Sequence, residues 1–264
     1  MIRTNMKLPT ETRKLVATKG CFSLLEYEKD YSVNPGNAAD AYYAAEMNIH
    51  KRQVCAELNG NGIIAQAGEM QIMMGNISAG TDVKGAGDLI RKFVGSSVTG
   101  ETAIKPRYTG YGVVVLEPTY NYILFENVED WVGGMVIEDG MFLACNDTVN
   151  LSVSARTTLS SALLGNEGLF NTTLSGTGVA VLESPVPSEE LIVVDLENDE
   201  IKIDGSMAIA WSDTLKFTVE RTTKTLIGSA ASGEGLVNVY RGTGRILIAP
   251  VSCDRFISRP RKQC

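Results

Sequence analysis

The feature of this sequence that most constrains its fold is an internal repeat with a period of about 66 residues. Three segments share a pattern in which two glycines lead into an apolar run, and their glycine pairs are Gly110/Gly112, Gly176/Gly178 and Gly242/Gly244. The pairs begin at positions 110, 176 and 242, so the spacing between successive copies is constant. Self-similarity at a fixed period indicates supersecondary units that bury a common core by stacking on one another.

A second motif also occurs three times, as apolar runs that begin at Met70, Met141 and Met207, each closely preceded by a glycine. The last two copies have the same spacing as the glycine pairs. The first two are slightly further apart, which places about five extra residues in the loop around 80–87 of the first unit. Because the methionine motif comes first and the glycine motif last, the order predicts that one unit is split between the ends of the core. The N-terminal half-unit would then pair with the C-terminal one and remove open sheet edges.

Short runs rich in Val, Ile and Leu, bounded by Gly, Asn and Asp, predict a β-rich core. The runs 192–196 and 201–203 read as consecutive strands joined by a tight turn. The dipeptides at 139–140 and 204–205 are Asp-Gly, a strong turn signal because glycine tolerates positive φ. The fold class predicted is all-β, with three pseudo-symmetric units and minor helices.

Outside the repeat, the pattern predicts three parts to the chain. Residues 1–52 form an N-terminal extension with a strand at 22–27, a loop at 33–37 and a helix at 38–46. Residues 53–250 form the threefold β core, whose length equals three periods of the repeat, and residues 251–264 form a tail. Further short helices are predicted at 88–94 and 159–164.

Composition restricts the partners and the compartment. The net charge of −7 and the pI near 4.9 disfavour phosphate backbones, so nucleic acid is a poor default partner. No secretory signal and no run long enough for a membrane span occur, which predicts a cytosolic protein. The five cysteines include no Cys-x-x-Cys pair and read as reduced thiols, with Cys55 and Cys145 as small core residues.

The two sets of motifs together, including the segments GEMQIMMGNIS, SGTGVAVLESP and GTGRILIAP, resemble the altered-inheritance-of-mitochondria family. The resemblance covers roughly residues 53–250. It implies a fold similar to the tryptophan RNA-binding attenuation protein (TRAP), with double-stranded β-helix or β-sandwich units repeated in the chain. It supplies no catalytic residue, and without a mitochondrial presequence it implies a bacterial-type cytosolic member.

Several residues invite a chemical interpretation, and in each case a structural one is preferred. His50, the only histidine, lies between the predicted helix and the core, which predicts an exposed linker residue and argues against a cupin-type metal site. The Gly85–Ile90 turn superficially resembles a phosphate loop, but its sixth position is Ile90 rather than glycine. The acidic stretch 195–200 lacks the glycine of a calcium loop and is predicted to be a solvated hairpin turn.

Carboxylates recur in register as Glu117/Glu183 and Asp147/Asp213, which duplication explains without catalysis. The methionines Met70, Met73 and Met74 are predicted to fill the core. The sequence therefore predicts no catalytic, cofactor-binding or metal-binding residue.

The preferred function is a non-enzymatic binding or scaffold protein whose partner is an unknown protein or small ligand. Two alternatives stay open. One is an oligomeric nucleic-acid-binding protein, which would need basic and aromatic residues along one edge. The other is a carboxylate-dependent enzyme, which would need two carboxylates in one pocket. Sandwich units of this kind often associate, which is compatible with a symmetric homo-oligomer.

Overall fold

The structure is a computed structural model that describes residues 3–81, 105–155, 170–221 and 236–251. The helices predicted at 88–94 and 159–164 and the Gly85–Ile90 turn lie outside these residues. The elements, in chain order, are β1 (Arg13–Lys19), β2 (Phe22–Tyr27), α1 (Ala38–Glu46), β3 (Lys51–Ala65), β4 (Met70–Gly80), β5 (Arg107–Leu116), β6 (Tyr122–Asn127), η1 (Val128–Asp130), β7 (Met135–Ile137), β8 (Phe142–Asn146), β9 (Val149–Ala155), β10 (Phe170–Gly176), β11 (Val179–Ser184), η2 (Ser188–Glu190), β12 (Ile192–Asp204), β13 (Ala208–Ser212), β14 (Lys216–Arg221) and β15 (Leu236–Ile248).

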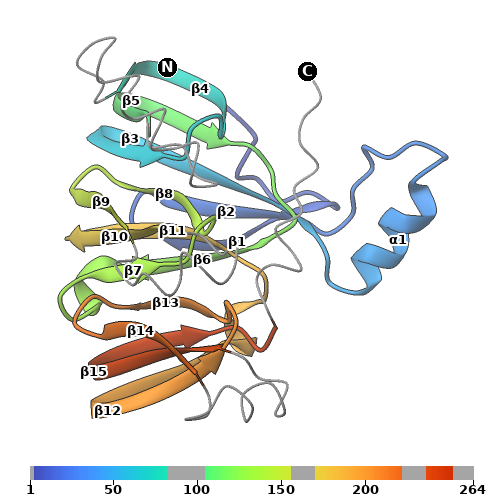
Figure 1. The fold of residues 1–264 in the computed structure, drawn as a ribbon. Helices are drawn as coiled ribbons and strands as arrows, with labels where there is room; N and C mark the ends of the chain where they lie inside the picture. Colours follow the sequence, from blue (N-terminus) through green and yellow to red (C-terminus); the bar gives the residue numbers. More distant parts are fainter. Residues whose placement is uncertain (1–2, 82–104, 156–169, 222–235, 252–264) are drawn as a thin grey trace.

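The described strands form two mainly antiparallel sheets (Figure 1). The eight-stranded sheet runs β1-β2-β3-β8-β11-β6, with β5 beside β3 and β4 beside β5. The seven-stranded sheet runs β12-β15-β13-β7-β10-β9, with β14 beside β15. The all-β prediction is confirmed, and the predicted strand at 22–27 and helix at 38–46 are present as β2 and α1.

Period-two alternation directs one face of each sheet into the core. In β3, Val54, Ala56 and Leu58 pack into a cluster between neighbouring strands, while Cys55 joins a smaller cluster on the opposite face. A larger cluster that includes Met135, Phe142 and Leu174 joins strands of the two sheets. Cys55 and Cys145 are fully buried, which confirms the prediction that they are core residues.

The Gly-x-Gly motif is required for close packing of β5 against β4. Gly110 and Gly112 have φ of 130° and 153°. A Cβ on Gly110 would lie 2.2 Å from the Asn76 carbonyl oxygen, and one on Gly112 would lie 2.0 Å from that of Met74. Only glycine allows this approach, so the motif has the backbone role that the sequence predicts. The turns at Gly140 and Gly205 likewise have positive φ.

Two sequence predictions about strand arrangement are wrong. Residues 192–204 form one strand, β12, and not a hairpin. An extra residue near Asn198, whose φ is 52°, is absorbed as an irregularity in the pairing with β15, so the chain bends without reversing.

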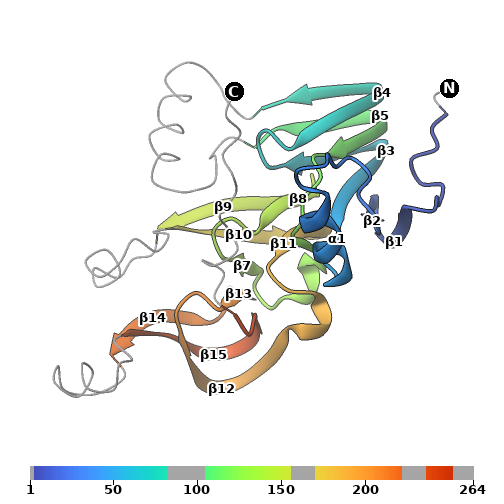
Figure 2. The same cartoon turned by 90° about the vertical axis from the view of Figure 1, so that its right-hand side faces the viewer.

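The predicted pairing of the N-terminal half-unit with the C-terminal one does not occur among the described strands. β4 pairs with β5, a strand close to it in the chain, while β15 lies in the other sheet. Figures 1 and 2 both place β4 at one end of the β body and β12 at the other. Local antiparallel pairing therefore replaces closure through the termini.

Candidate functional site

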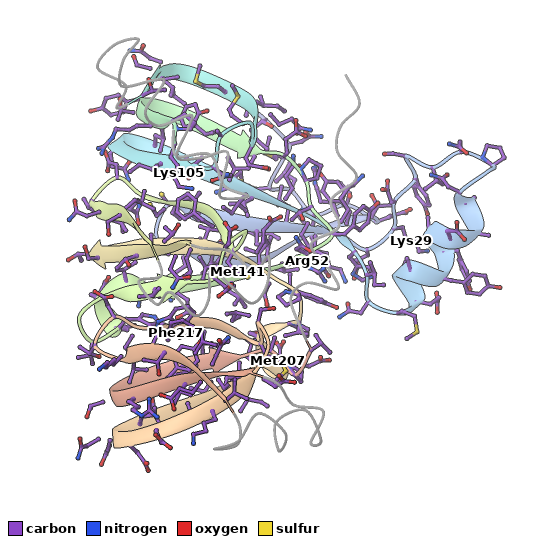
Figure 3. The ribbon with its side chains drawn as sticks, viewed as in Figure 1. Lys29, Arg52, Lys105, Met141, Met207 and Phe217 are labelled. Atoms are coloured by element: carbon purple, nitrogen blue, oxygen red, sulfur yellow. The ribbon has the colours of Figure 1, made fainter. Side chains whose placement is uncertain are left out.

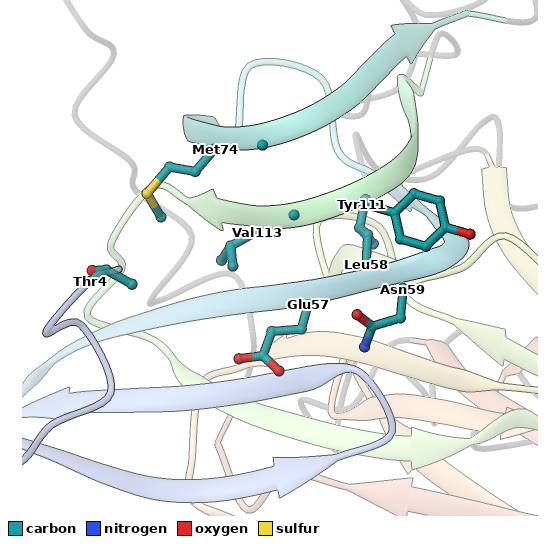
Figure 4. Close-up of a pocket in the computed structure, with 9 residues that line it drawn as sticks. Thr4, Glu57, Leu58, Asn59, Met74, Tyr111 and Val113 are labelled. Atoms are coloured by element: carbon teal, nitrogen blue, oxygen red, sulfur yellow. The ribbon is translucent and has the colours of Figure 1, made fainter. Parts of the chain in front are cut away.

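A cavity of about 400 Å³ lies on the face of β3, β4 and β5 that carries the smaller hydrophobic cluster (Figure 4). Its apolar side chains are Met74 and Val113, the Leu58 side chain packs on the opposite face of β3, and the backbone of the Gly-x-Gly strand contributes to its wall. Thr4, from the N-terminal segment, lies at its edge. A cavity of this size with a mixed lining suits a small, weakly polar ligand.

Polar groups are few in this first cavity. Glu57 is ion-paired with Lys7, with 2.7 Å between the ammonium nitrogen and the carboxylate oxygen. Asn59 offers an amide, and Tyr111, 65% exposed, presents its ring. One paired carboxylate and one amide can orient a ligand by hydrogen bonds.

A second feature is the arm, defined as residues 28–50, which connects β2 to β3 and carries α1. Figure 1 shows α1 standing outside the β body, and none of its residues is buried. Tyr42 and Tyr43 pack edge to face at 5.5 Å and are 61% and 68% exposed. A nine-residue helix is marginal by itself in water, so its contacts at the base of the arm determine its position.

The base of the arm is held by the clamp, defined as Glu26, His50 and Arg52. Arg52 is 3% exposed, lies where the arm meets the body (Figure 3), and its Nε is 2.8 Å from the Glu26 carboxylate. Its guanidinium donates to the carbonyls of Asn48 and His50 and stacks on the Tyr122 ring at 4.0 Å. A buried guanidinium with this many acceptors fixes the backbone that leads out of α1.

His50 completes the clamp. Its Nδ1 lies 3.0 Å from the Glu26 carboxylate and its Nε2 lies 3.2 Å from the Ala45 carbonyl oxygen, in the last turn of α1. Both partners are hydrogen-bond acceptors, so each ring nitrogen of His50 faces an acceptor, one on β2 and one on α1. The side chain is 15% exposed, so the prediction of an exposed linker histidine is wrong. The fold brings Glu26 beside it, which chain position alone does not reveal.

A second cavity, of about 370 Å³, lies between the arm and the body and is lined partly by Asp30, His50, Lys51 and Tyr120. Burial opposes ionisation of Asp30, but hydrogen bonds from the Lys51 ammonium and the Ser32 backbone N–H outweigh it and lower its pKa. The Tyr120 hydroxyl donates to the same carboxylate at 3.1 Å, and burial together with this bond raises the Tyr120 pKa. A carboxylate held this way is a weak proton acceptor at neutral pH.

Two of the three methionines in the run 70–74 are not core residues. On β4, Met70 is 36% exposed and Met73 is 41% exposed, so the prediction that these residues fill the core is wrong. Met74 alone packs against the smaller cluster. β4 is bordered on one side only among the described strands, and a sequence pattern does not show which strand lies at a sheet edge.

The remaining residues singled out from the sequence are dispersed. The acidic stretch 195–200 lies on β12, where Asp195 pairs with Arg245 and Glu200 with Arg241. Asp147 contacts Arg107 at 3.4 Å, and Glu183 is buried on β11. Among the described residues, no group of three or more metal-ligating side chains gathers.

Burial raises the pKa of the Cys145 thiol to about 12. Cys21, Cys55 and Cys145 are free thiols. Within the described part of the chain, no helix has the length and apolar character needed to cross a membrane. Arg52 and the tyrosines of the arm were missed by the sequence reasoning; the aromatic pair within a predicted helix outside the repeat was the available signal.

Comparisons with known proteins agree with this architecture. The family described as mitochondrial biogenesis AIM24 matches residues 45–251. An uncharacterized protein of Streptococcus pyogenes serotype M6 is 27% identical over 207 residues, which cover 75% of this chain and 80% of that protein. A crystal structure of a Streptococcus pyogenes protein has a TM-score of 0.58 at 24% identity, and the match covers 79% of this chain and 91% of that one. This likeness shows a shared fold.

Proposed function

The chain belongs to the mitochondrial biogenesis AIM24 family, and from this premise and its geometry we propose that it is a non-enzymatic scaffold that binds a protein partner through the arm. The observation that carries this proposal is the exposure of Tyr42 and Tyr43 on a helix outside the β body. Aromatic side chains are enriched at protein interfaces, because they bury much area at little entropic cost.

The clamp supports this role for the arm. Arg52 and His50 hold the base of α1 through hydrogen bonds to the Glu26 carboxylate and to backbone carbonyls. A binding element that is already positioned loses less conformational freedom when a partner docks. The clamp thus positions the tyrosine pair while leaving it accessible.

We also propose that the β body consists of three successive units, residues 51–116, 122–184 and 192–248, of the TRAP-like kind. The pairing register within each unit supports this, since Ile63 on β3 faces Tyr108 on β5, Met135 on β7 faces Leu174 on β10, and Ile201 on β12 faces Tyr240 on β15. Those partners are residues 108, 174 and 240, at the spacing of the glycine motif.

The charge distribution favours a protein partner over nucleic acid. Several described cations are paired with carboxylates, as in the pairs Arg241–Glu220, Arg245–Asp195 and Lys51–Asp30. A nucleic-acid surface would need such cations to be available along one edge. We propose a cytosolic site of action, which suits the free thiols of the described cysteines.

Native mass spectrometry of protein purified gently from its own cells tests the proposed function. We expect wild type to carry a polypeptide of fixed mass, and the double variant Tyr42→Ser/Tyr43→Ser to lose it. Tyr111→Ser is the matched control, because it removes a similarly exposed tyrosine from the β body and should retain the polypeptide.

The other outcomes separate the alternatives. An oligonucleotide mass would favour the nucleic-acid-binding function. A metabolite mass lost from Tyr111→Ser would assign a ligand to the first cavity and leave room for a carboxylate-dependent enzyme. A clean apo species in all three proteins would overturn partner binding through the arm.

A further inference from the structure

β4 is an unusual edge strand. Its 11 residues, MQIMMGNISAG, include no charged side chain and no proline, and most of them are exposed. Within the part of the chain that the structure describes, β4 pairs with β5 alone. Long, uncharged edge strands are templates for another strand, and natural proteins usually cover or charge them.

The strands that carry the same motif elsewhere in the chain are covered on both sides. β8 lies between β11 and β3, and β13 lies between β15 and β7. Their residues are almost all buried, in contrast to those of β4. The exposure of β4 therefore reflects a missing neighbour and not a different kind of sequence.

The missing neighbour has a defined identity in the other two cases. β8 pairs with β3, the first strand of the preceding unit, and β13 pairs with β7, which follows β6, the first strand of the preceding unit, after η1. The register is also the same. On β8, Cys145 faces Ala180 of its own unit, and the next residue, Asn146, faces Ile63 of the preceding unit. On β13, Trp211 faces Ile246 of its own unit, and the next residue, Ser212, faces Met135 of the preceding unit.

The complementary vacant edge lies at the far end of the molecule. β12 is the first strand of the third unit, and among the described strands it pairs with β15 alone. It thus lacks the strand that β3 has in β8 and that β7 has in β13. Because β4 and β12 lie at opposite ends of the body (Figures 1 and 2), β4 of the same copy cannot fill this edge.

We propose that β4 of one copy pairs antiparallel with β12 of a second copy, so that the pattern inside the chain continues from copy to copy. This inference rests on the proposed three-unit organisation. Met73 faces Val114, and Cys145 faces Ala180, the residue one repeat period after Val114. Met73 of β4 therefore corresponds to Cys145 of β8. The pairs between copies are then Ile201 with Met74, Lys202 with Met73 and Ile203 with Ile72.

Charge selects this head-to-tail arrangement over self-pairing of β12. β12 carries five carboxylates, at Asp195, Glu197, Asp199, Glu200 and Asp204, against the single cation Lys202. Two copies of this strand side by side would repel each other, because like charges across strands are destabilising. The uncharged β4 adds no charge to this edge. Since the contact joins different surfaces, it produces a ring or an open filament.

Sedimentation velocity on the purified protein over a range of concentrations tests this pairing. We expect wild type to form species larger than the monomer. Met73→Lys places a cation opposite Lys202 and should weaken association on the order of tenfold. Because Met73 is 41% exposed, the variant should keep the circular dichroism and melting temperature of wild type.

The rescue variant Met73→Lys/Lys202→Glu defines the register, because it replaces the repulsive pair by an attractive one. It should restore association, and Lys202→Glu alone should stay associated. A monomeric wild type, an unaffected Met73→Lys, or a double variant as dissociated as Met73→Lys would each overturn the proposal. These variants leave Tyr42 and Tyr43 unchanged, and the purified protein contains no partner protein. A negative result would therefore count against pairing between copies and not against binding of a partner through the arm.

Discussion

Arg241 shows how single residues on the exposed strands of the smaller sheet interact. It contacts Glu220 on β14 and Glu200 on β12, so it links the two strands that flank β15. The hydrogen bond from Arg241 and a weaker one from Thr218 lower the pKa of Glu220 to about 2. The same contact raises the pKa of Arg241.

This pair leads to a pH prediction. Because the folded-state pKa of Glu220 lies below its ordinary value of 4.5, its contribution to stability is complete above about pH 4.5 and is lost as the pH falls towards 2. In Arg241→Gln, the pKa of Glu220 should return towards 4.5. A carbon-13 NMR titration of the side-chain carboxyl groups measures this, with Lys14→Gln as a control on a distant ion pair. An unchanged Glu220 titration in Arg241→Gln would contradict the assignment.

Residue identity alone predicted the backbone role of the glycine pairs and the burial of Cys55 and Cys145, because both follow from local chemistry. It did not predict the surroundings of His50 or Met73. His50 depends on Glu26, which is distant in the sequence, and Met73 depends on which strand forms the sheet edge. Such facts are set by tertiary arrangement.

At the scale of elements, the packing of β4 on β5 depends on Gly110. Gly110→Ala would set a methyl group 2.2 Å from the Asn76 carbonyl oxygen at a φ of 130°, so one strand would have to move. We expect the free energy of unfolding to fall by about 2 kcal/mol. Urea denaturation measures it. Gly80→Ala is the control, because a Cβ there meets nothing within 4 Å, and equal effects in the two variants would refute the packing argument.

The arm is a second element whose stability depends on few contacts. Arg52→Met removes the buried cation of the clamp and leaves the Glu26 carboxylate with a weaker set of partners. Amides of α1 should then exchange with deuterium at least about tenfold faster, while those of β13 serve as an internal reference. Lys14→Met, on an exposed ion pair, should leave α1 unchanged. Unaltered exchange in Arg52→Met would show that other contacts hold the arm.

Elements were predicted better than their arrangement. β2 and α1 follow from local pattern and have the expected bounds. The chain at 192–204 was predicted to be a hairpin because Glu-Asn-Asp-Glu resembles a turn, yet pairing with β15 on both sides of Asn198 keeps it extended. The sequence also implied that the N-terminal half-unit pairs with the C-terminal one. In the structure, β4 pairs with β5 and β15 pairs with β12, so each strand pairs with one close to it in the chain.

At the scale of the whole molecule, the charge of −7 opposes association of identical copies. The proposed contact between β4 and β12 uses backbone hydrogen bonds and apolar side chains, so salt screens the repulsion without weakening an ion pair. Raising the salt concentration from about 50 mM to about 500 mM shortens the range of electrostatic forces to a few ångströms. Wild-type association should therefore strengthen.

Added salt should favour association of the rescue variant less than association of wild type. In Met73→Lys/Lys202→Glu, part of the contact depends on an ion pair near the surface, and salt screens this attraction together with the repulsion between copies. Sedimentation velocity at the two salt concentrations compares them directly. Wild type should gain severalfold in affinity, and the double variant should gain less or lose affinity. Equal salt responses would mean that residues 73 and 202 do not meet, and would place the contact between copies elsewhere on the molecule.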